Sequence, residues 1–478
     1  MSDRLSAIRR TLEQHEQSHL LRFYDELDAP RQAALLDEIE GIDFLALQAL
    51  IEEHMQAAPE AALPGDLAPA SYYGRDPDNP VRPYDAAHYR RVGEELIRQG
   101  KVAAFTVAGG QGTRLGWNGP KGTYPGTVVT GKPLFRCFAE QILAAQKRWS
   151  VTIPWYIMTS PINDADTRAF FLDNNCFGLR RKNVFMFPQG MLPSIDAASG
   201  KLLLADKHAL ALSPDGHGGS IKALRASGAV EDMMARGVEH ISYFQVDNPL
   251  VNVIDPLFIG LHATAPDSSA EMSSKMVPKT CPEEKVGVFC AAGGKTTVLE
   301  YSDLPEQLAS ERDADGNLRY IAGSIAIHII GVAFVQRLTA DAHHFGLPYH
   351  RAVKKVPFID PDTGRQVEPT SPNAVKFETF VFDALPRAES SIVYETDRVE
   401  EFAPIKNAKG VDSVETSHQL QSERAGRWLE AHGVSVPRDG DGRIAARIEI
   451  SPLTAREPAD LVAVDLPRAI AAGEEMLL

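Results

Sequence analysis

The stretch "AFTVAGGQGTRLGWNGPKGTYP", residues 104–125, decides how the rest of the chain is interpreted. It starts inside an apolar run, contains six glycines, and places Arg114 and Lys121 just beyond the densest of them. Glycine has no Cβ, so it takes positive φ easily and lets backbone N–H groups approach a ligand. Such a nest of N–H groups suits a phosphate, and nearby cations neutralise charge that amides alone leave uncompensated. The stretch therefore predicts a nucleotide-phosphate site.

Two common nucleotide-binding loops do not fit this stretch. A Walker A loop needs Gly-Lys-Ser/Thr, which is absent, and Gly110, Gly112 and Gly116 miss the dinucleotide spacing by one residue. Residues 130–136 also lack the acidic residue that contacts a dinucleotide ribose. A nicotinamide-dependent dehydrogenase stays an alternative, but this spacing weakens it.

Strand and helix patterns alternate on both sides of the glycine loop. The expected strands are 101–107, 155–160, 183–187 and 241–246, and the expected helices are 133–150, 163–175 and 218–237. This alternation favours a mostly parallel sheet with helices on both faces, and ligands of such sheets bind beyond the carboxyl ends of the strands. Asp247 follows one of these strands, where a single carboxylate and nucleotide phosphates could hold Mg²⁺.

The organisation along the chain indicates three parts. Residues 1–95 predict a helical N-terminal domain with helices over 5–27 and 30–55 and a connector over 57–84, and residues 96–385 predict the α/β catalytic domain. Within it, residues 270–345 are strand-rich and are expected to extend the sheet with antiparallel strands. Residues 386–478 predict a small α+β domain.

Composition narrows the function classes. A formal net charge of -15 disfavours nucleic acid or an anionic membrane as partner, so an anionic ligand needs a locally basic pocket. The four cysteines form no metal-binding spacing, and neither a signal peptide nor a long apolar run is present. We therefore expect a cytoplasmic protein.

Seven motifs, in order, carry a resemblance to a known family. They are "VAGGQGTRLG" (107–116), "PKG" (120–122), "FPQGMLP" (187–193), "PDGHGG" (214–219), "VDNPLV" (246–251), "KFETFVFD" (376–383) and "PIKNAKG" (404–410). With them the chain resembles eukaryotic-type UDP-sugar pyrophosphorylases over nearly its whole length, and most closely UDP-N-acetylhexosamine pyrophosphorylases.

The resemblance implies a fold and a reaction. The fold is a central Rossmann-like nucleotidyltransferase domain with a mixed sheet, flanked by the smaller N- and C-terminal domains. The reaction takes UTP and an N-acetylhexosamine 1-phosphate to UDP-N-acetylhexosamine (UDP-GlcNAc or UDP-GalNAc) and pyrophosphate, with Mg²⁺, in a monomer or homodimer. It needs no protein nucleophile, because in-line displacement depends on positioning and charge.

The resemblance also implies roles for particular residues. Arg114, Lys121 and Lys406 would bind phosphates during catalysis, and Asp247 would bind the metal. The implied nucleotide contacts are Val107, Ala108, Gly109, Gly110, Gln189, Gly216 and Lys376. The implied sugar contacts are His217, Glu300, Gly323, Ser324, Phe380 and Phe382.

Two of these positions depart from the family pattern. His217 stands where relatives usually have Asn, and Ser324 stands where they have the Asn of "NAGN". Loss of a buried amide removes a hydrogen bond of about 1 kcal/mol or more. The departures leave open the same chemistry on glucose 1-phosphate or galactose 1-phosphate, and a further alternative is a UDP-sugar sensor without turnover.

Overall fold

The computed structural model describes residues 2–55, 63–341 and 345–478. The chain forms two compact units. The smaller contains residues 1–63, 189–223 and 338–383, and the larger contains residues 64–188, 224–337 and 384–478. Residues 57–62 of the expected connector lie outside the described residues. The three consecutive domains expected from the sequence stay a prediction.

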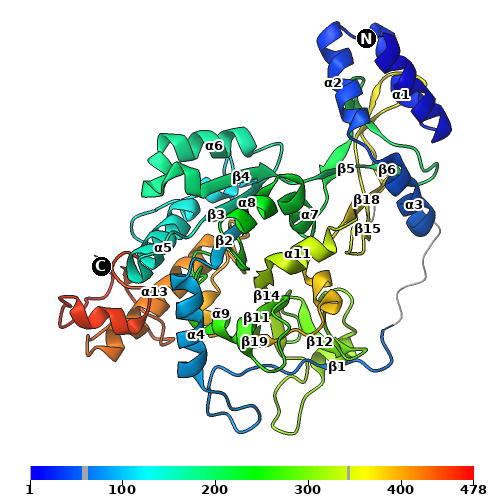
Figure 1. Cartoon of the computed structure of the whole chain (residues 1–478). Coiled ribbons are helices and arrows are strands. Elements are labelled where there is room, and N and C mark those ends of the chain that lie inside the picture. The colour runs from blue at the N-terminus through cyan, green and yellow to red at the C-terminus, as the bar shows by residue number, and fades with distance from the viewer. Residues whose placement is uncertain (1, 56–62, 342–344) are drawn as a thin grey trace. The chain divides into compact units, whose positions relative to one another are not determined.

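The larger unit is built around a mixed sheet of ten strands (Figure 1). Its parallel part runs β4 (Val184–Pro188), β3 (Trp155–Thr159), β2 (Val102–Val107) and β10 (His240–Gln245). β14 (Ala322–Gly331) pairs antiparallel with β10, β11 (Met272–Pro278) and β12 (Val288–Ala292), and β12 pairs with β13 (Lys295–Leu299). The expected parallel core and its antiparallel extension are confirmed. β1 (Ala68–Pro69) and β19 (Val393–Glu395) pair with β12 and β11.

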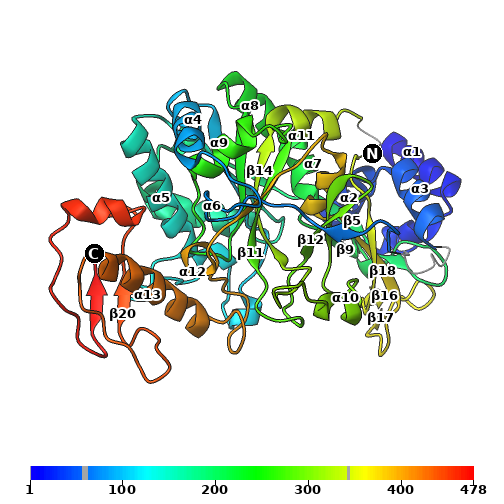
Figure 2. The ribbon, with the colours of Figure 1, turned by 90° about the horizontal axis from the view of Figure 1, so that it is seen from below.

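Two helices of the larger unit pack together at a pair of glycines. α4 (Ala86–Arg98) and α9 (Pro256–Thr264) lie side by side in both views (Figures 1 and 2). A Cβ at Gly93 would lie 1.8 Å from the carbonyl oxygen of Pro256, and one at Gly260 would lie 1.8 Å from that of Tyr89. Only glycine permits this approach. Asp255 begins α9, since its carboxylate accepts from the N–H groups of Leu257 and Phe258.

Other helices of this unit follow the expected ranges with one break. α5 (Leu134–Trp149) and α6 (Asp164–Asp173) lie within the predicted helices. The helix expected over 218–237 is two helices, α7 (Gly219–Ala226) and α8 (Ala229–Ala235), because Gly228 between them has a φ of 79°. α10 (Glu306–Ser310), α11 (Val332–Leu338) and α12 (Arg398–Glu401) are short. No helix among the described residues combines the length and apolar character that crossing a bilayer requires.

The C-terminal segment, which we define as residues 413–478, belongs to the larger unit. α13 (Val414–Ala431) begins at a capping box between Ser413 and Thr416 and packs on the parallel pair β20 (Arg447–Glu449) and β21 (Glu475–Leu477) (Figure 2). Trp428, Leu429, Ile444 and Ile448 form its own small apolar core. The mixture of helix and strands expected for this part of the chain is confirmed.

The smaller unit combines the N-terminal helices with strands from two distant segments. α1 (Ser2–Gln14) ends early and two 3-10 turns follow it, so the helix expected over 5–27 is broken, with Glu16 at a φ of 56°. α2 (Ala29–Glu40) and α3 (Phe44–Met55) divide the second expected helix after Gly41. Leu12, Leu20 and Leu35 share a core with Ile195, Val375 and Phe377.

The strands of this unit form small sheets. β15 (His350–Lys354), β18 (Ala374–Glu378) and β6 (Ile195–Asp196) make an antiparallel sheet of three strands. Four two-residue or three-residue strands pair as β5 (Met191–Pro193) with β9 (Leu212–Pro214) and β7 (Leu204–Asp206) with β8 (Ala209–Leu210). β16 (Phe358–Ile359) pairs with β17 (Gln366–Val367). β18 ends immediately before Thr379, whose backbone is hydrogen-bonded to Asp215 and Gly218.

Candidate functional site

The glycine loop leaves the carboxyl end of β2 and is held by backbone and side-chain hydrogen bonds. The N–H of Ala108 donates to the Met158 carbonyl at 2.8 Å, and the N–H of Lys121 donates to the Gly110 carbonyl at 3.0 Å. The buried Asn163 amide donates to the carbonyls of Ala108 (3.0 Å) and Gly110 (3.3 Å). These hydrogen bonds engage the carbonyl groups of the loop within the protein and so constrain the shape of the loop.

The glycines of this loop serve purposes that differ from the expectation. Gly112 has a φ of -80°, and its role is close packing, because a Cβ there would lie 2.6 Å from the Cβ of Trp117. The positive φ values of the stretch occur at Gly116 (69°) and Gly119 (148°). A Cβ at Gly110 would meet no protein atom within 4 Å, so the protein itself leaves the space beside Gly110 open.

Lys121 and Asp247 are brought together at the carboxyl edge of the sheet. The Lys121 Nζ lies 3.6 Å from the Asp247 Oδ2, and both side chains are less than one-fifth exposed. Among the described residues, no group donates a hydrogen bond to the Asp247 carboxylate. Both of its oxygens are therefore available to a metal ion or to another donor. The pair therefore combines one available carboxylate with one ammonium group beside the glycine loop.

Lys406 lies on a segment that is bonded to the Asp247 backbone. The N–H of Ile405 donates to the Asp247 carbonyl at 2.8 Å, and the Lys406 Nζ lies 3.1 Å from the Asp412 carboxylate. Arg114 is exposed and forms no ion pair within the part of the chain that the structure describes. In the larger unit, Lys121 thus lies beside Asp247, and the backbone residue before Lys406 is bonded to the Asp247 backbone. Arg114 lies on the same glycine stretch as Lys121.

Three expected sugar contacts lie near one another at the start of β14. Ser324 donates its N–H to the Gly287 carbonyl at 2.7 Å, and Gly323 pairs with Val288 in the next strand. A Cβ at Gly287 would lie 3.7 Å from the Glu300 Oε1. Because β14 runs antiparallel to β10, its first residues lie at the sheet edge where β10 ends.

In the smaller unit, the loop "PDGHGG" is bonded to the end of β18. The N–H of Gly218 donates to the Thr379 carbonyl and the N–H of Thr379 donates to the Asp215 carbonyl, both at 2.8 Å. Gly216 has a φ of 85°, and a Cβ there would lie 2.4 Å from the Thr379 carbonyl oxygen. This pairing brings Gly216 and His217 to Phe380 and Phe382.

His217 is held in a defined orientation and tautomer. Its ring stacks on Phe380 with centroids 5.3 Å apart and lies 5.8 Å from the Phe382 ring. Burial, and secondarily the charge of His350, lowers the pKa of His217 to about 4, so the imidazole is neutral near pH 7. Its Nδ1 accepts the N–H of Val381 at 3.2 Å, which leaves the proton on Nε2. His217 therefore offers one hydrogen-bond donor.

Two further expected contacts and one unexpected carboxyl group occupy the same unit. Gln189 is buried directly after β4, and Lys376 lies on the face of β18 opposite the buried Val375 and Phe377. Asp215 is buried, its Oδ1 has no hydrogen-bond partner among the residues that the structure describes, and burial raises its pKa to about 7. Cβ atoms at Gly190 and Gly219 would lie 2.5 and 2.1 Å from this carboxylate, so it is enclosed by backbone.

Sequence reasoning missed several residues that shape these groups. The sequence places Asn163 only at the start of an expected helix, and it places Asn248 and Asp215 only within their motifs. The hydrogen-bond partners of the two asparagines lie in distant segments of the chain. The sequence indicates only that each of these residues is polar and lies within or near a motif. No group of three or more His, Cys, Asp or Glu side chains suited to a metal ion occurs among the described residues.

Comparisons with known proteins show which family this chain is similar to. The family model of UTP–glucose-1-phosphate uridylyltransferase matches residues 76–431. A UDP-N-acetylhexosamine pyrophosphorylase-like protein 1 of Xenopus tropicalis is 38% identical over 93% of this chain and 91% of its own length. The UDP-N-acetylglucosamine pyrophosphorylase of Saccharomyces cerevisiae is 36% identical over 89% of this chain and 91% of its own.

A solved structure has the same fold over the entire chain. The uridine diphosphate N-acetylglucosamine pyrophosphorylase of Trypanosoma brucei aligns with a TM-score of 0.80 and 26% identity, covering 100% of this chain and 98% of that one. The nucleotidyltransferase fold expected from the motifs is confirmed.

Proposed function

Because the chain belongs to the UTP–glucose-1-phosphate uridylyltransferase family, we propose that it transfers the uridylyl group of UTP to an N-acetylhexosamine 1-phosphate. The products are UDP-N-acetylhexosamine and pyrophosphate. The observation that carries the proposal is the Lys121–Asp247 pair, 3.6 Å apart beside a glycine loop whose Gly110 faces open space. The names of the relatives given above favour UDP-N-acetylhexosamines over UDP-hexoses as the products in this proposal.

The proposed reaction is an in-line displacement. A phosphate oxygen of the sugar 1-phosphate attacks the α-phosphorus of UTP, and the bond to the β-phosphate bridging oxygen breaks, so pyrophosphate leaves with that electron pair. Val107 to Gly110 would bind the nucleotide, and the amines of Lys121 and Lys406 with the guanidinium of Arg114 would stabilise the charge on the phosphates.

Magnesium is part of this proposal, and the residues present fit it. Mg²⁺ is usually bound by one or two carboxylates together with substrate phosphates and water. Asp247 supplies one largely buried carboxylate whose oxygens are not engaged by other donors among the described residues. When bound there, the ion would neutralise phosphate charge.

The sugar side of the proposal rests on His217, Phe380, Phe382, Glu300, Gly323 and Ser324. The neutral His217 offers its Nε2–H to an acceptor, where the relatives' amide offers both a donor and an acceptor. The two phenyl rings beside it suit an apolar group such as an acetyl methyl. Gln189, Gly216 and Lys376 would contact the nucleotide.

The test is pyrophosphate release from UTP and Mg²⁺ with a panel of sugar 1-phosphates. We expect turnover with N-acetylglucosamine or N-acetylgalactosamine 1-phosphate to exceed that with glucose or galactose 1-phosphate at equal concentration. The reverse order would show that glucose 1-phosphate or galactose 1-phosphate is the substrate. Binding of UDP-sugar without any pyrophosphate release would identify a sensor and overturn the enzymatic proposal.

A further inference from the structure

Asn248 is a buried amide that connects two segments of the proposed site. It follows Asp247 directly and its side chain is 5% exposed. Its Nδ2 donates to the Glu401 carbonyl at 2.6 Å, and its Oδ1 accepts the N–H of Ala403 at 3.0 Å. One side chain thus pairs with both a donor and an acceptor of a segment more than 150 residues away along the chain, as the sequence separations of 153 and 155 show.

The segment that Asn248 contacts is itself fixed by a buried charge network. The Glu401 carboxylate accepts from the Lys275 Nζ at 2.6 and 2.7 Å and from the Thr396 hydroxyl at 2.8 Å. Lys275 is fully buried and also donates to Asp255 at 2.6 Å. Buried ion pairs of this kind resist displacement, because removing one partner leaves an uncompensated charge.

The same two segments carry two of the proposed catalytic groups. Three residues after the Asn248 contact at Ala403, the chain reaches Lys406, and between them the Ile405 N–H donates to the Asp247 carbonyl at 2.8 Å. Asn248 and Ile405 therefore provide consecutive bridges from the Asp247 strand end to the Lys406 segment.

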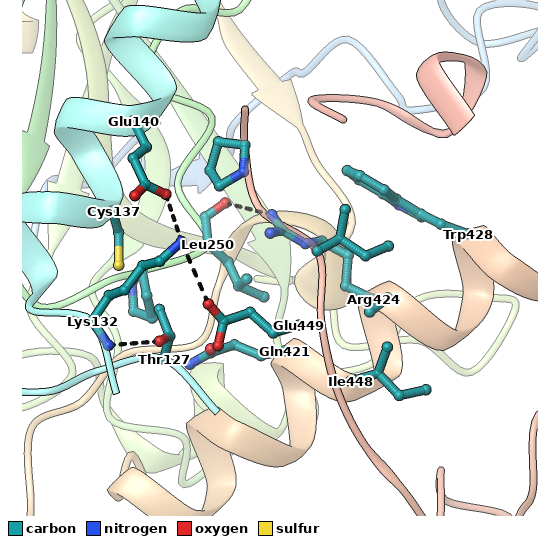
Figure 3. Close-up of a pocket in the computed structure, with 14 residues that line it drawn as sticks. Thr127, Lys132, Cys137, Glu140, Leu250, Gln421, Arg424, Trp428, Ile448 and Glu449 are labelled. Carbon is teal, nitrogen blue, oxygen red and sulfur yellow. Dashed lines mark hydrogen bonds and ion pairs between the residues drawn. The ribbon is translucent and has the colours of Figure 1, made fainter. Parts of the chain in front are cut away.

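The loop after Asn248 is held from the other side by the C-terminal segment. Arg424 of α13 donates to the Leu250 carbonyl at 3.4 Å, and Figure 3 shows this guanidinium reaching the loop beside Trp428. The cavity whose lining Figure 3 draws lies between this loop, at Leu250, and α13, at Arg424 and Trp428. Hydrogen bonds thus connect Asn248 to the segment of Glu401 and Ala403, and the loop that follows it to the C-terminal segment.

We propose that Asn248 is a positioning residue for the uridylyl transfer, which fixes the separation between the Asp247 carboxylate and the Lys406 amine. The inference rests on the proposed function. The chemistry of an amide is required, because an alanine would leave the Glu401 carbonyl and the Ala403 N–H unpaired in the interior. An aspartate would keep the shape but direct an oxygen at the Glu401 carbonyl. A shift of about 1 Å in such a site costs about 100-fold in rate.

The experiment compares Asn248→Ala and Asn248→Asp with Asn183→Ala in the full chain. Asn183 is a matched control, since it is 6% exposed, accepts from Arg236 at 3.2 Å, and precedes β4 at the amino edge of the sheet, away from Asp247. Three quantities are measured: the melting temperature, the steady-state kinetics, and the affinity for UTP by calorimetry with and without Mg²⁺.

We expect both Asn248 variants to lower kcat by about 10–100-fold with a KM for the sugar 1-phosphate changed by less than about twofold. We also expect the tightening of UTP binding by Mg²⁺ to shrink several-fold, while metal-free UTP affinity stays near that of the wild type. Asn183→Ala should lower only the melting temperature.

The outcomes separate this inference from the proposed function. An inactive wild type whose UTP affinity ignores Mg²⁺ refutes the proposed function. An active wild type, with Asn248 variants that match Asn183→Ala in kcat and in Mg²⁺ response, overturns the inference alone. The same conclusion follows if neither Asn248 variant folds while the control does, because the residue then serves stability only.

Discussion

At the scale of single residues, Lys121 has the most direct expected effect. Its amine lies 3.6 Å from the Asp247 carboxylate, on the glycine stretch whose Gly110 borders open space. Lys121→Ala should lower kcat by about 100-fold or more, because it removes charge stabilisation of the transition state. Pyrophosphate release measures this. Lys147→Ala, an exposed lysine of α5, is the control, and an unchanged kcat in Lys121→Ala would remove Lys121 from the catalytic role.

Asp215 gives a prediction about pH. Burial raises its pKa from 3.8 to about 7 in the folded chain, so the folded state binds this proton more tightly than the unfolded state does. The contribution of Asp215 to stability is therefore most favourable at low pH and is lost as pH rises from about 4 to 7. Asp215→Asn should raise the melting temperature relative to the wild type more at pH 8 than at pH 5. An equal difference at both pH values would contradict the shifted pKa.

Whether the sequence predicts the position of a site residue depends on how far away in the sequence its contacts lie. Asp247 and Lys121 could be placed at one sheet edge because both follow predicted elements, and the structure puts them 3.6 Å apart. The amide of Asn163, in contrast, reaches two carbonyls of the glycine loop more than 50 residues earlier, as its separations of 55 and 53 show. Periodicity contains no information on such pairings. Roles in binding UTP and sugar stay predictions for every site residue.

At the scale of elements, strands were predicted better than helix ends. The apolar runs of β2, β3 and β10 are buried on both faces of the sheet, which makes them recognisable in isolation, and the edge strand β4 is partly buried. Helix breaks depended on backbone conformations, such as the left-handed Gly228, that hydrophobic spacing does not encode. The site edge could therefore be predicted from the strands alone, whereas the α7–α8 division could not.

The α4–α9 crossing yields a prediction at this scale. Because a Cβ at Gly93 would lie 1.8 Å from a backbone carbonyl of α9, Gly93→Ala should force the helices apart. We expect the free energy of unfolding to fall by about 1–3 kcal/mol or more, as in other overpacked sites. Chemical denaturation followed by circular dichroism measures it. Gly440→Ala is the control, since a Cβ there meets no atom within 4 Å, and equal stability of both variants would refute the tight contact.

At the scale of the whole molecule, each unit is assembled from segments that are far apart in sequence. β18 pairs with β6 through Ala374–Asp196 and Val375–Ile195, which joins two segments of the smaller unit that are far apart in the sequence. Local sequence patterns show where elements begin and end, but they do not show which distant strands pair. The C-terminal segment joins the larger unit in the same way, through Glu449, which accepts from the N–H groups of Val129 and Thr130 at 3.0 and 2.8 Å.

Ligand binding gives a test on the whole chain, because a ligand that binds only the folded state raises its stability by mass action. At a concentration 100 times its Kd, the gain is about 2.7 kcal/mol. We expect UTP to raise the melting temperature, UTP with Mg²⁺ to raise it further, and NAD to leave it unchanged. Asp247→Asn should abolish only the increment due to Mg²⁺, because the nucleotide loop and its hydrogen bonds do not depend on that carboxylate. Stabilisation by NAD but not by UTP would instead support the dehydrogenase alternative, and a Mg²⁺ increment that survives Asp247→Asn would place the metal ligand elsewhere.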